Sequence, residues 1–213
     1  VLVSTFTFII ISNAHEELQE KNHTLKTDYT NNQKELIKNH VNYIINFIDY
    51  YNETNKNKKS EALIQKEVLE IIEKLRVNEN PNEYIFIYDF NGNLVQDAIA
   101  KKDNIGHNYL NIKDIKGKEV VKELITTSKR NLGGYVEYVW LKPEISKQTT
   151  KISYALSYNK WNWTIGKGVY LDEIDKLIKE KEEDYNQKIS NYTLQITSLT
   201  IMLVLYSIFI YKN

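Results

Sequence analysis

Uncharged hydrophobic stretches lie at both ends of the chain, and an amphipathic pattern fills the middle. The C-terminal stretch runs from Leu194 to Tyr211 without a charged residue. At ~1.5 Å per residue, a helix of this length spans roughly 27 Å, close to the ~30 Å hydrocarbon core of a bilayer. Tyr192 precedes this stretch as part of an aromatic belt, and Lys212 follows it as a cytoplasmic anchor. The pattern predicts a transmembrane helix over residues 193–211, with a buried core helix as the alternative.

The N-terminal stretch, residues 1–12, is apolar but too short to cross a bilayer alone. We interpret it as the end of a first transmembrane helix. The alternative is the hydrophobic region of a signal peptide. The absence of a cleavage-like small-residue motif before the helix that follows favours the transmembrane helix.

Between these ends, the apolar spacing first predicts helices. Residues 13–51 contain no Gly or Pro, and their apolar positions recur at spacings of three, four and seven. This pattern predicts a long amphipathic helix, longer than one globular core requires, which rises out of the membrane. A polar connector covers residues 52–60, and a second helix is predicted over residues 61–76.

The apolar period changes to two at Tyr84, which marks the start of a sheet region over residues 84–170. Asn91-Gly92 is a strong hairpin signal within it. The other expected strands cover residues 134–140, 151–156 and 163–170, and residues 117–130 are expected to be helical. An exit helix over residues 171–192 then leads into the C-terminal span. Residues 13–192 are therefore predicted to form one α+β domain.

Composition excludes several classes of function. The 28 cationic and 28 anionic residues give a net charge of zero, so nothing indicates a nucleic-acid partner. The sequence has no cysteine and therefore no disulfide or thiolate zinc site. The four histidines lack metal-ligand spacing, and the three on the long helix are expected to face water. No catalytic constellation, metal site or cofactor motif is recognisable, so this segment is not expected to be an enzyme.

Four segments together resemble the single Cache family, in its second subtype. They read EYIFIYDFNGNLV (83–95), GHNYLNIKDIKGK (106–118), GGYVEYVWLKP (133–143) and KISYALSYNKWNWTIGKGVYLDEI (151–174). Each segment alone is weakly specific, but their order over about residues 60–178 is typical of the family. The resemblance implies a PAS-like antiparallel sheet of five or six strands, with a long N-terminal helix along one side. Such domains form the sensor parts of chemoreceptors, histidine kinases and diguanylate cyclases, and many bind acetate, propionate, pyruvate or lactate.

The resemblance also implies candidate ligand-binding residues. A carboxylate ligand needs charge-assisted hydrogen bonds in a sheltered pocket. Arg76 occupies the position of a family arginine and is the expected anion clamp, although it is equally suited to end a helix in solvent. Tyr84 matches a pocket tyrosine. Lys151 and Tyr154 match a family K-x-S-Y motif, but residues three apart on a regular strand face opposite sides, which favours Lys151.

Three further candidates lie on or just after the strand expected over residues 134–140. Tyr138 and Trp140 share a strand face, because they are two residues apart, and Lys142 lies just beyond them. This face can present aromatic walls and a cation to the pocket, although an aromatic core stripe explains Trp140 equally well. The sequence departs from the family pattern after the hairpin, where it reads Val95-Gln96-Asp97 in place of a common His-Pro pair. This change leaves an amine, an amino acid or a neutral ligand open as the alternative ligand.

These features predict the extracytoplasmic sensor domain of a receptor in the bacterial inner membrane. Residues 13–192 are expected on the periplasmic or extracellular side, and the receptor is expected to be a homodimer through the 13–51 helix. The expected ligand is a small carboxylate, and the signal passes through the second transmembrane helix. Any kinase or cyclase output domain lies outside this sequence. The alternative is a membrane-tethered dimerisation module without a small ligand.

Overall fold

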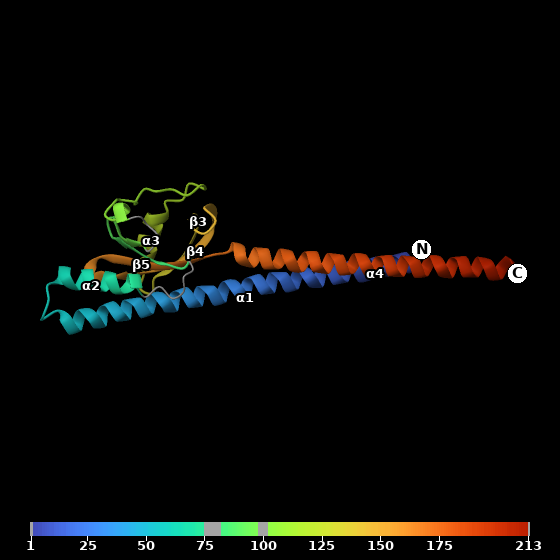
Figure 1. Ribbon diagram of the computed structural model, residues 1–213, viewed down its shortest axis with the longest axis horizontal. Coiled ribbons are helices and arrows are strands. Elements are labelled where there is room, and N and C mark those ends of the chain that lie inside the picture. The colour runs from blue at the N-terminus through green and yellow to red at the C-terminus, as the bar shows by residue number, and fades with distance from the viewer. Residues whose placement is uncertain (1, 75–81, 98–101, 213) are drawn as a thin grey trace. The chain divides into compact units, whose positions relative to one another are not determined.

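The computed structural model describes residues 2–74, 82–97 and 102–212 (Figure 1). The chain divides into two compact units. One unit comprises residues 30–172 and holds the whole sheet, and the other comprises residues 1–29 and 173–213. Each unit is described by itself below.

The larger unit is built on one antiparallel sheet of five strands in the order β2-β1-β5-β4-β3. The first strand of the chain therefore lies beside the last, in the middle of the sheet. Successive residues of a strand point to opposite faces, so each strand contributes side chains to both faces of the sheet. The strands are β1 Ile85–Asp89, β2 Leu94–Asp97, β3 Gly134–Lys142, β4 Lys147–Tyr158 and β5 Trp163–Tyr170. This sheet confirms the predicted PAS-like α+β fold.

The hairpin between β1 and β2 forms at the predicted Asn91-Gly92 pair. Gly92 has a φ of +88°, which favours glycine, and a Cβ there would lie 2.6 Å from the Cβ of Leu110. The carboxylate of Asp89 accepts hydrogen bonds from the backbone N–H groups of Asn91 and Asn93, both at 2.9 Å. The turn is thus determined locally by glycine geometry and one aspartate.

The described residues also form four α-helices and two short 3₁₀ helices. The first helix joins the segments predicted over residues 1–12 and 13–51 and ends at Asn55, and the last runs unbroken through the predicted exit helix and membrane span. The helix expected over residues 117–130 is shorter, and the predicted end of the second helix at Arg76 lies outside the described residues. The helices are α1 Leu2–Asn55, α2 Glu61–Lys74, α3 Val120–Ser128, α4 Asp172–Lys212, η1 Lys102–Asn104 and η2 Asn159–Trp161.

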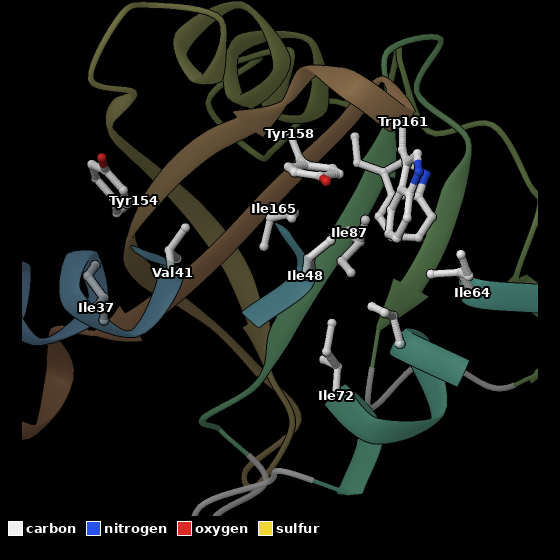
Figure 2. Close-up of a cluster of buried hydrophobic side chains, with 12 residues drawn as sticks. Ile37, Val41, Ile48, Ile64, Ile72, Ile87, Tyr154, Tyr158, Trp161 and Ile165 are labelled. Carbon is white, nitrogen blue, oxygen red and sulfur yellow. The ribbon is translucent and has the colours of Figure 1, made fainter. Parts of the chain in front are cut away.

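One face of the sheet packs against α1 and α2 through a cluster of aliphatic and aromatic side chains (Figure 2). Its side chains come from β1, β4, β5 and the η2 turn as well as from the two helices. Ile165 at its centre is completely buried. The cluster comprises Ile37, Val41, Ile48, Ile64, Val68, Ile72, Ile87, Tyr154, Tyr158, Trp161, Trp163 and Ile165.

The opposite face packs against α3 and is richer in tyrosine and in polar groups. Val120, Val121 and Leu124 of α3 lie against aromatic side chains of β1 and β3. Ser128 at the end of α3 shares a 2.9 Å hydrogen bond with Thr164 of β5, and both side chains are fully buried. The sheet therefore separates two clusters of different chemistry.

In the smaller unit, the first part of α1 and most of α4 are joined by polar contacts. The Asn22 side chain donates to Glu182 at 3.0 Å, and Lys26 pairs with Asp175 at 2.5 Å. Among the described residues, one helix is long and apolar enough to cross a membrane, within Ile174–Tyr211. The first transmembrane helix expected over residues 1–12 stays a prediction.

Candidate functional site

On the α3 face of the sheet, the candidates Lys151 and Tyr138 lie in one row with Tyr170. The strand register places Lys151 of β4 directly opposite Tyr138 of β3 on one side and Tyr170 of β5 on the other. Residues that pair across antiparallel strands point to the same face. Tyr84, just before β1, lies within reach of this row.

Lys151 is the most unusual group of the row, because its long side chain is 1% exposed. Its Nζ donates a hydrogen bond to the Tyr84 hydroxyl at 2.7 Å and lies 3.9 Å from the centre of the Tyr84 ring and 5.0 Å from that of Tyr170. Among the described residues, no carboxylate lies within ion-pair distance of it. Burial lowers the pKa of Lys151 to about 7, and the negative charge of Asp97 opposes this shift.

Gly168 provides the space for this lysine. A Cβ at Gly168 would lie 2.6 Å from the Cε of Lys151 and 2.1 Å from the Oγ of Ser153. Any side chain at this position would therefore displace the buried lysine or the serine. The glycine of the G-x-G segment thus has a structural role that determines the shape of the site.

A small cavity lies between these aromatic side chains and α3. Its volume is about 10 Å³, room for about one water molecule. Trp140 and Asp97 are the two lining residues that are not fully buried, so the cavity reaches solvent beside them. The lining consists of five aromatic residues (Tyr84, Phe86, Tyr88, Tyr138 and Trp140), three aliphatic residues of α3 (Val120, Val121 and Leu124) and Asp97.

The tyrosines of the site are neutral hydrogen-bonding groups. Burial raises the pKa of Tyr84 and of Tyr138 well above the usual range, and burial raises that of Tyr170 to about 12. The Tyr138 hydroxyl shares a 2.8 Å hydrogen bond with Ser153, and its ring packs edge-to-face on Trp140 with centroids 5.7 Å apart. At neutral pH these hydroxyls can donate to an anion without themselves carrying charge.

The structure therefore brings together Tyr84, Tyr138, Trp140 and Lys151, and it separates the other candidates from them. Lys142 forms an ion pair with Asp172 at 2.9 Å. Tyr154 lies on the opposite face of the sheet, as strand alternation requires, and its hydroxyl donates to the Leu132 carbonyl at 2.6 Å. Arg76 lies outside the described residues.

Sequence reasoning did not include Ser153 and Tyr170, which lie beside Lys151. Ser153 had a usable signal, since it follows Lys151 by two residues and must share its strand face. Tyr170 had none, because only the register of β4 with β5 brings it opposite Lys151. Asp97 belongs to the segment that departs from the family pattern, and in the structure it lines the small cavity.

The expectation that all three helix histidines face water is wrong for His40. His15 and His23 are exposed, but His40 is half-buried against the sheet. Its Nδ1 lies 2.9 Å from the Nζ of Lys167, which also pairs with Glu83 at 3.1 Å. Burial and the neighbouring Lys167 lower the pKa of His40. The sequence pattern missed this contact because it forms between residues 127 positions apart.

Comparisons with known proteins agree with this architecture. Residues 29–184 match the family described as Single Cache domain 2. The sensor histidine kinase MctS of Rhizobium johnstonii is 40% identical over 91 residues, which cover 43% of this chain and 19% of MctS. The methyl-accepting chemotaxis protein McpP of Pseudomonas putida is 29% identical over 116 residues, which cover 54% of this chain and 21% of McpP. The chain thus spans about a fifth of the length of these relatives.

Solved structures show the same fold. A methyl-accepting chemotaxis protein from Vibrio parahaemolyticus superposes with a TM-score of 0.62 at 26% identity, covering 74% of this chain and 99% of that one. A Cache chemosensory domain, described for its carboxylic acid recognition, superposes with a TM-score of 0.57 at 24% identity, covering 70% of this chain and 97% of that one.

The family match includes all five strands, the second part of α1 and the first turns of α4. It begins within the long helix and therefore extends further than the expected residues 60–178. The sequence match, the strand order and the structural neighbours all lead to the same conclusion. The chain belongs to the Single Cache domain 2 family of sensor domains.

Proposed function

We propose that this chain is the extracytoplasmic sensor domain of a transmembrane receptor and that it binds a small carboxylate on the α3 face of its sheet. The observation that carries the proposal is Lys151, a fully buried ammonium whose described hydrogen-bond partner is one neutral hydroxyl. Burying a charge without a counter-charge is costly, and a bound carboxylate would remove that cost. Arg76, outside the described residues, remains proposed as a second cation.

The relatives support a sensory role. Two of them are named as a sensor histidine kinase and a chemotaxis protein. One structural neighbour is described for carboxylic acid recognition, which makes the same ligand class a reasonable choice here. The output domain of the whole protein, a kinase or a chemotaxis module, is part of this proposal.

A short path connects the site to the start of α4. Tyr170, whose ring faces Lys151, ends β5, and Asp172 begins α4 two residues later. Asp172 is held by the buried Lys142, whose Nζ also lies 5.8 Å from the centre of the Tyr170 ring. A ligand that draws Lys151 away from Tyr170 would change the packing at this junction. We propose that α4 carries this change toward the membrane.

The proposed topology places residues 13–192 outside the cytoplasm of a bacterial inner membrane. Reporter fusions near Asn55 and after Asn213 test it. The two fusions should report opposite sides of the membrane, and a result on the same side for both would contradict the receptor assignment.

An exposed stripe on α1 supports a parallel homodimer. Leu36, Tyr43 and Tyr50 are seven residues apart, and their exposed fractions are 50%, 69% and 72%. Exposed asparagines at residues 39 and 46 complete a heptad-like 3-4 spacing. A second copy would cover this stripe, with the asparagines setting the register. Disulfide crosslinking of Tyr43→Cys in membranes should trap a dimer, whereas Lys38→Cys should crosslink poorly.

The alternative function, a dimerisation module without a ligand, is favoured by the small size of the cavity. At about 10 Å³, the cavity admits no carboxylate until its walls move. The exposed stripe on α1 is compatible with both functions. A ligand-binding measurement therefore distinguishes a sensor from a dimerisation module.

A thermal-shift screen against short carboxylates, amino acids and amines is the direct test. A ligand that binds only the folded protein raises its melting temperature. We expect a carboxylate to stabilise the parent protein and to leave Lys151→Met unchanged. If no compound raises the melting temperature of the parent protein, the result favours the dimerisation module without a ligand. If a carboxylate stabilises both proteins equally, Lys151 is not the anion partner.

A further inference from the structure

His40 joins α1 to the middle strand of the sheet through a contact with Lys167. Lys167 lies on β5, pairs across the sheet with Tyr154 and is 7% exposed. Because Tyr154 belongs to the cluster under α1, Lys167 points to this face as well. Its Nζ lies 2.9 Å from the Nδ1 of His40 and 3.1 Å from a carboxylate oxygen of Glu83. The ammonium therefore lies between one carboxylate and one imidazole.

The contact between His40 and Lys167 exists only while the imidazole is neutral. An ammonium has no lone pair, so Lys167 must be the donor and the Nδ1 of His40 the acceptor. A neutral imidazole that accepts at Nδ1 carries its proton on Nε2, and an imidazolium has no acceptor nitrogen at all. Protonation of His40 thus replaces a hydrogen bond by two cations in contact.

The charges around His40 do not compensate for a second cation. Among the described residues, Glu83 is the carboxylate that acts on His40, and it already pairs with Lys167. Tyr154, beside Lys167 on β4, is uncharged, and burial raises its pKa further. Burial and Lys167 lower the pKa of His40, and Glu83 opposes them. The residues three and four positions from His40 on α1 are also uncharged, namely Leu36, Ile37, Tyr43 and Ile44.

His40 lies in the stretch of α1 that anchors this helix to the sheet. Ile37 precedes it and Val41 follows it, and both are buried in the cluster of Figure 2. The exposed Leu36 and Tyr43 of the proposed dimer stripe lie four positions before it and three positions after it. A displacement of the imidazole therefore affects both the buried and the exposed face of α1.

From this geometry we infer that the domain has a second input besides a ligand, and that this input is acidification. At neutral pH the uncharged imidazole fastens α1 to β5. Protonation of His40 breaks its contact with Lys167, and the repulsion between the two cations loosens α1 from the sheet. This response does not use the carboxylate site, so it goes beyond the proposed function and is tested independently of it.

The direction of the effect follows from proton linkage. The pKa of His40 is lower in the folded protein than the 6.5 of an unperturbed histidine, so the unfolded chain binds the proton more readily. The stability that neutral His40 provides is therefore complete above pH 6.5 and is lost as the pH falls through the folded pKa. Lys151 contributes its pH dependence above pH 7, so the two groups act in separate ranges.

Hydrogen exchange of the full chain in nanodiscs measures the loosening. Between about pH 7.5 and about pH 5, after correction for intrinsic rates, the amides of residues 36–44 should lose protection. The loss should be up to about tenfold for each pH unit by which the pKa of His40 lies below 6.5. His40→Asn keeps a neutral acceptor near the position of Nδ1 and should abolish this loss. His23→Asn, at an exposed histidine of the same helix, is the matched control and should retain it.

An NMR titration of the histidine ring signals tests the same contact in the parent protein, where no variant has to fold. His40 should titrate below pH 6.5, and its pKa should rise in Lys167→Met because the neighbouring cation is gone. Equal protection at both pH values, or a loss of protection that persists in His40→Asn, overturns the inference. An unchanged His40 titration in Lys167→Met overturns it too. None of these results involves a ligand, whereas the thermal-shift screen decides the proposed function.

Discussion

The two faces of the sheet are built from alternate residues of the same strands, yet they differ in chemistry. The face toward α1 and α2 holds a cluster of aliphatic and aromatic side chains, with Ile165 completely buried at its centre. The face toward α3 holds a buried lysine, a buried serine and a row of tyrosines around a small cavity. Tyr154 and Lys151, three residues apart on β4, lie on different faces.

The difference indicates a division of labour within one sheet. An apolar interface between a sheet and a long helix is stabilised by the area it removes from water, and it contains no group with an unmet charge. The α3 face gives up part of that stabilisation, because it encloses Lys151 without a counter-ion among the described residues. Substitutions on the first face should therefore affect folding, and those on the second should affect binding.

Removal of apolar volume from the α1 face should have the largest effect. Ile165→Ala creates a cavity in a close-packed cluster, so we expect it to lower the free energy of unfolding by about 2–5 kcal/mol. Ile145→Ala, at a side chain that is 51% exposed beyond β3, is the matched control and should change it little. Urea denaturation followed by tryptophan fluorescence measures both. Equal effects would show that the α1 face does not dominate stability.

Lys151→Met should have the opposite pattern of effects, with a large loss of ligand affinity and little or no loss of stability. A truncated charge partner in a buried pair costs about 2–5 kcal/mol of binding, so carboxylate affinity should fall by about 1.5 to 3.5 orders of magnitude. The melting temperature should stay the same or rise, because a buried ammonium is replaced by an apolar chain of similar length. Lys147→Met, at an exposed position of the same strand, should alter neither. A marked loss of stability in Lys151→Met would instead assign the lysine to the core.

Arg76 is predicted to contribute a bidentate contact to the carboxylate. Arg76→Ala should weaken binding by about 2–4 kcal/mol and leave the fold intact. Arg76→Lys should restore only part of that loss, because an ammonium cannot reproduce the planar fork. Calorimetry with the ligand from the screen measures both, and Lys74→Ala is the neighbouring control. Parent-like affinity of Arg76→Ala would leave Lys151 as the principal cation.

The pH dependence of the protein should follow Lys151. Its pKa is about 7 when folded and 10.5 in the unfolded chain, so between these values the unfolded chain binds more protons. The contribution of Lys151 to the free energy of unfolding therefore increases as the pH rises from 7 toward 10.5 and decreases as the pH falls back to 7. A bound anion favours the ammonium, so carboxylate affinity should decrease by up to about tenfold per pH unit above 7. Binding and melting curves at several pH values should lose this slope in Lys151→Met.

The smallest effect is expected for Tyr138→Phe. The loss of one neutral hydrogen bond should cost about 1 kcal/mol of ligand affinity. Tyr154→Phe removes a hydroxyl from the opposite face and serves as its control, with no expected change in affinity. If Tyr154→Phe weakens binding and Tyr138→Phe does not, the ligand occupies the other face of the sheet.

The sequence by itself determined the element types, the α+β class and the family. Periods of 3.6 and 2 are local properties, so the long helix, the strands and the hairpin at Asn91-Gly92 could be predicted without tertiary information. Local patterns do not fix helix ends, and α1 ends at Asn55 where the sequence predicted an end at residue 51. Of the candidate site residues, Tyr84, Tyr138, Trp140 and Lys151 lie together in the structure, and their role in ligand binding stays a prediction.

Only the tertiary structure decided which residues accompany them. Tyr170 faces Lys151 because β4 and β5 pair in one particular register, and that register depends on contacts across the whole sheet. Lys142 is drawn to Asp172 and His40 to Lys167 by partners distant in sequence, which no local pattern specifies. The burial of Lys151 has the same origin. A lysine in a sequence normally predicts an exposed side chain. Lys151 is buried because aromatic rings enclose it and because Gly168 has no side chain to displace it.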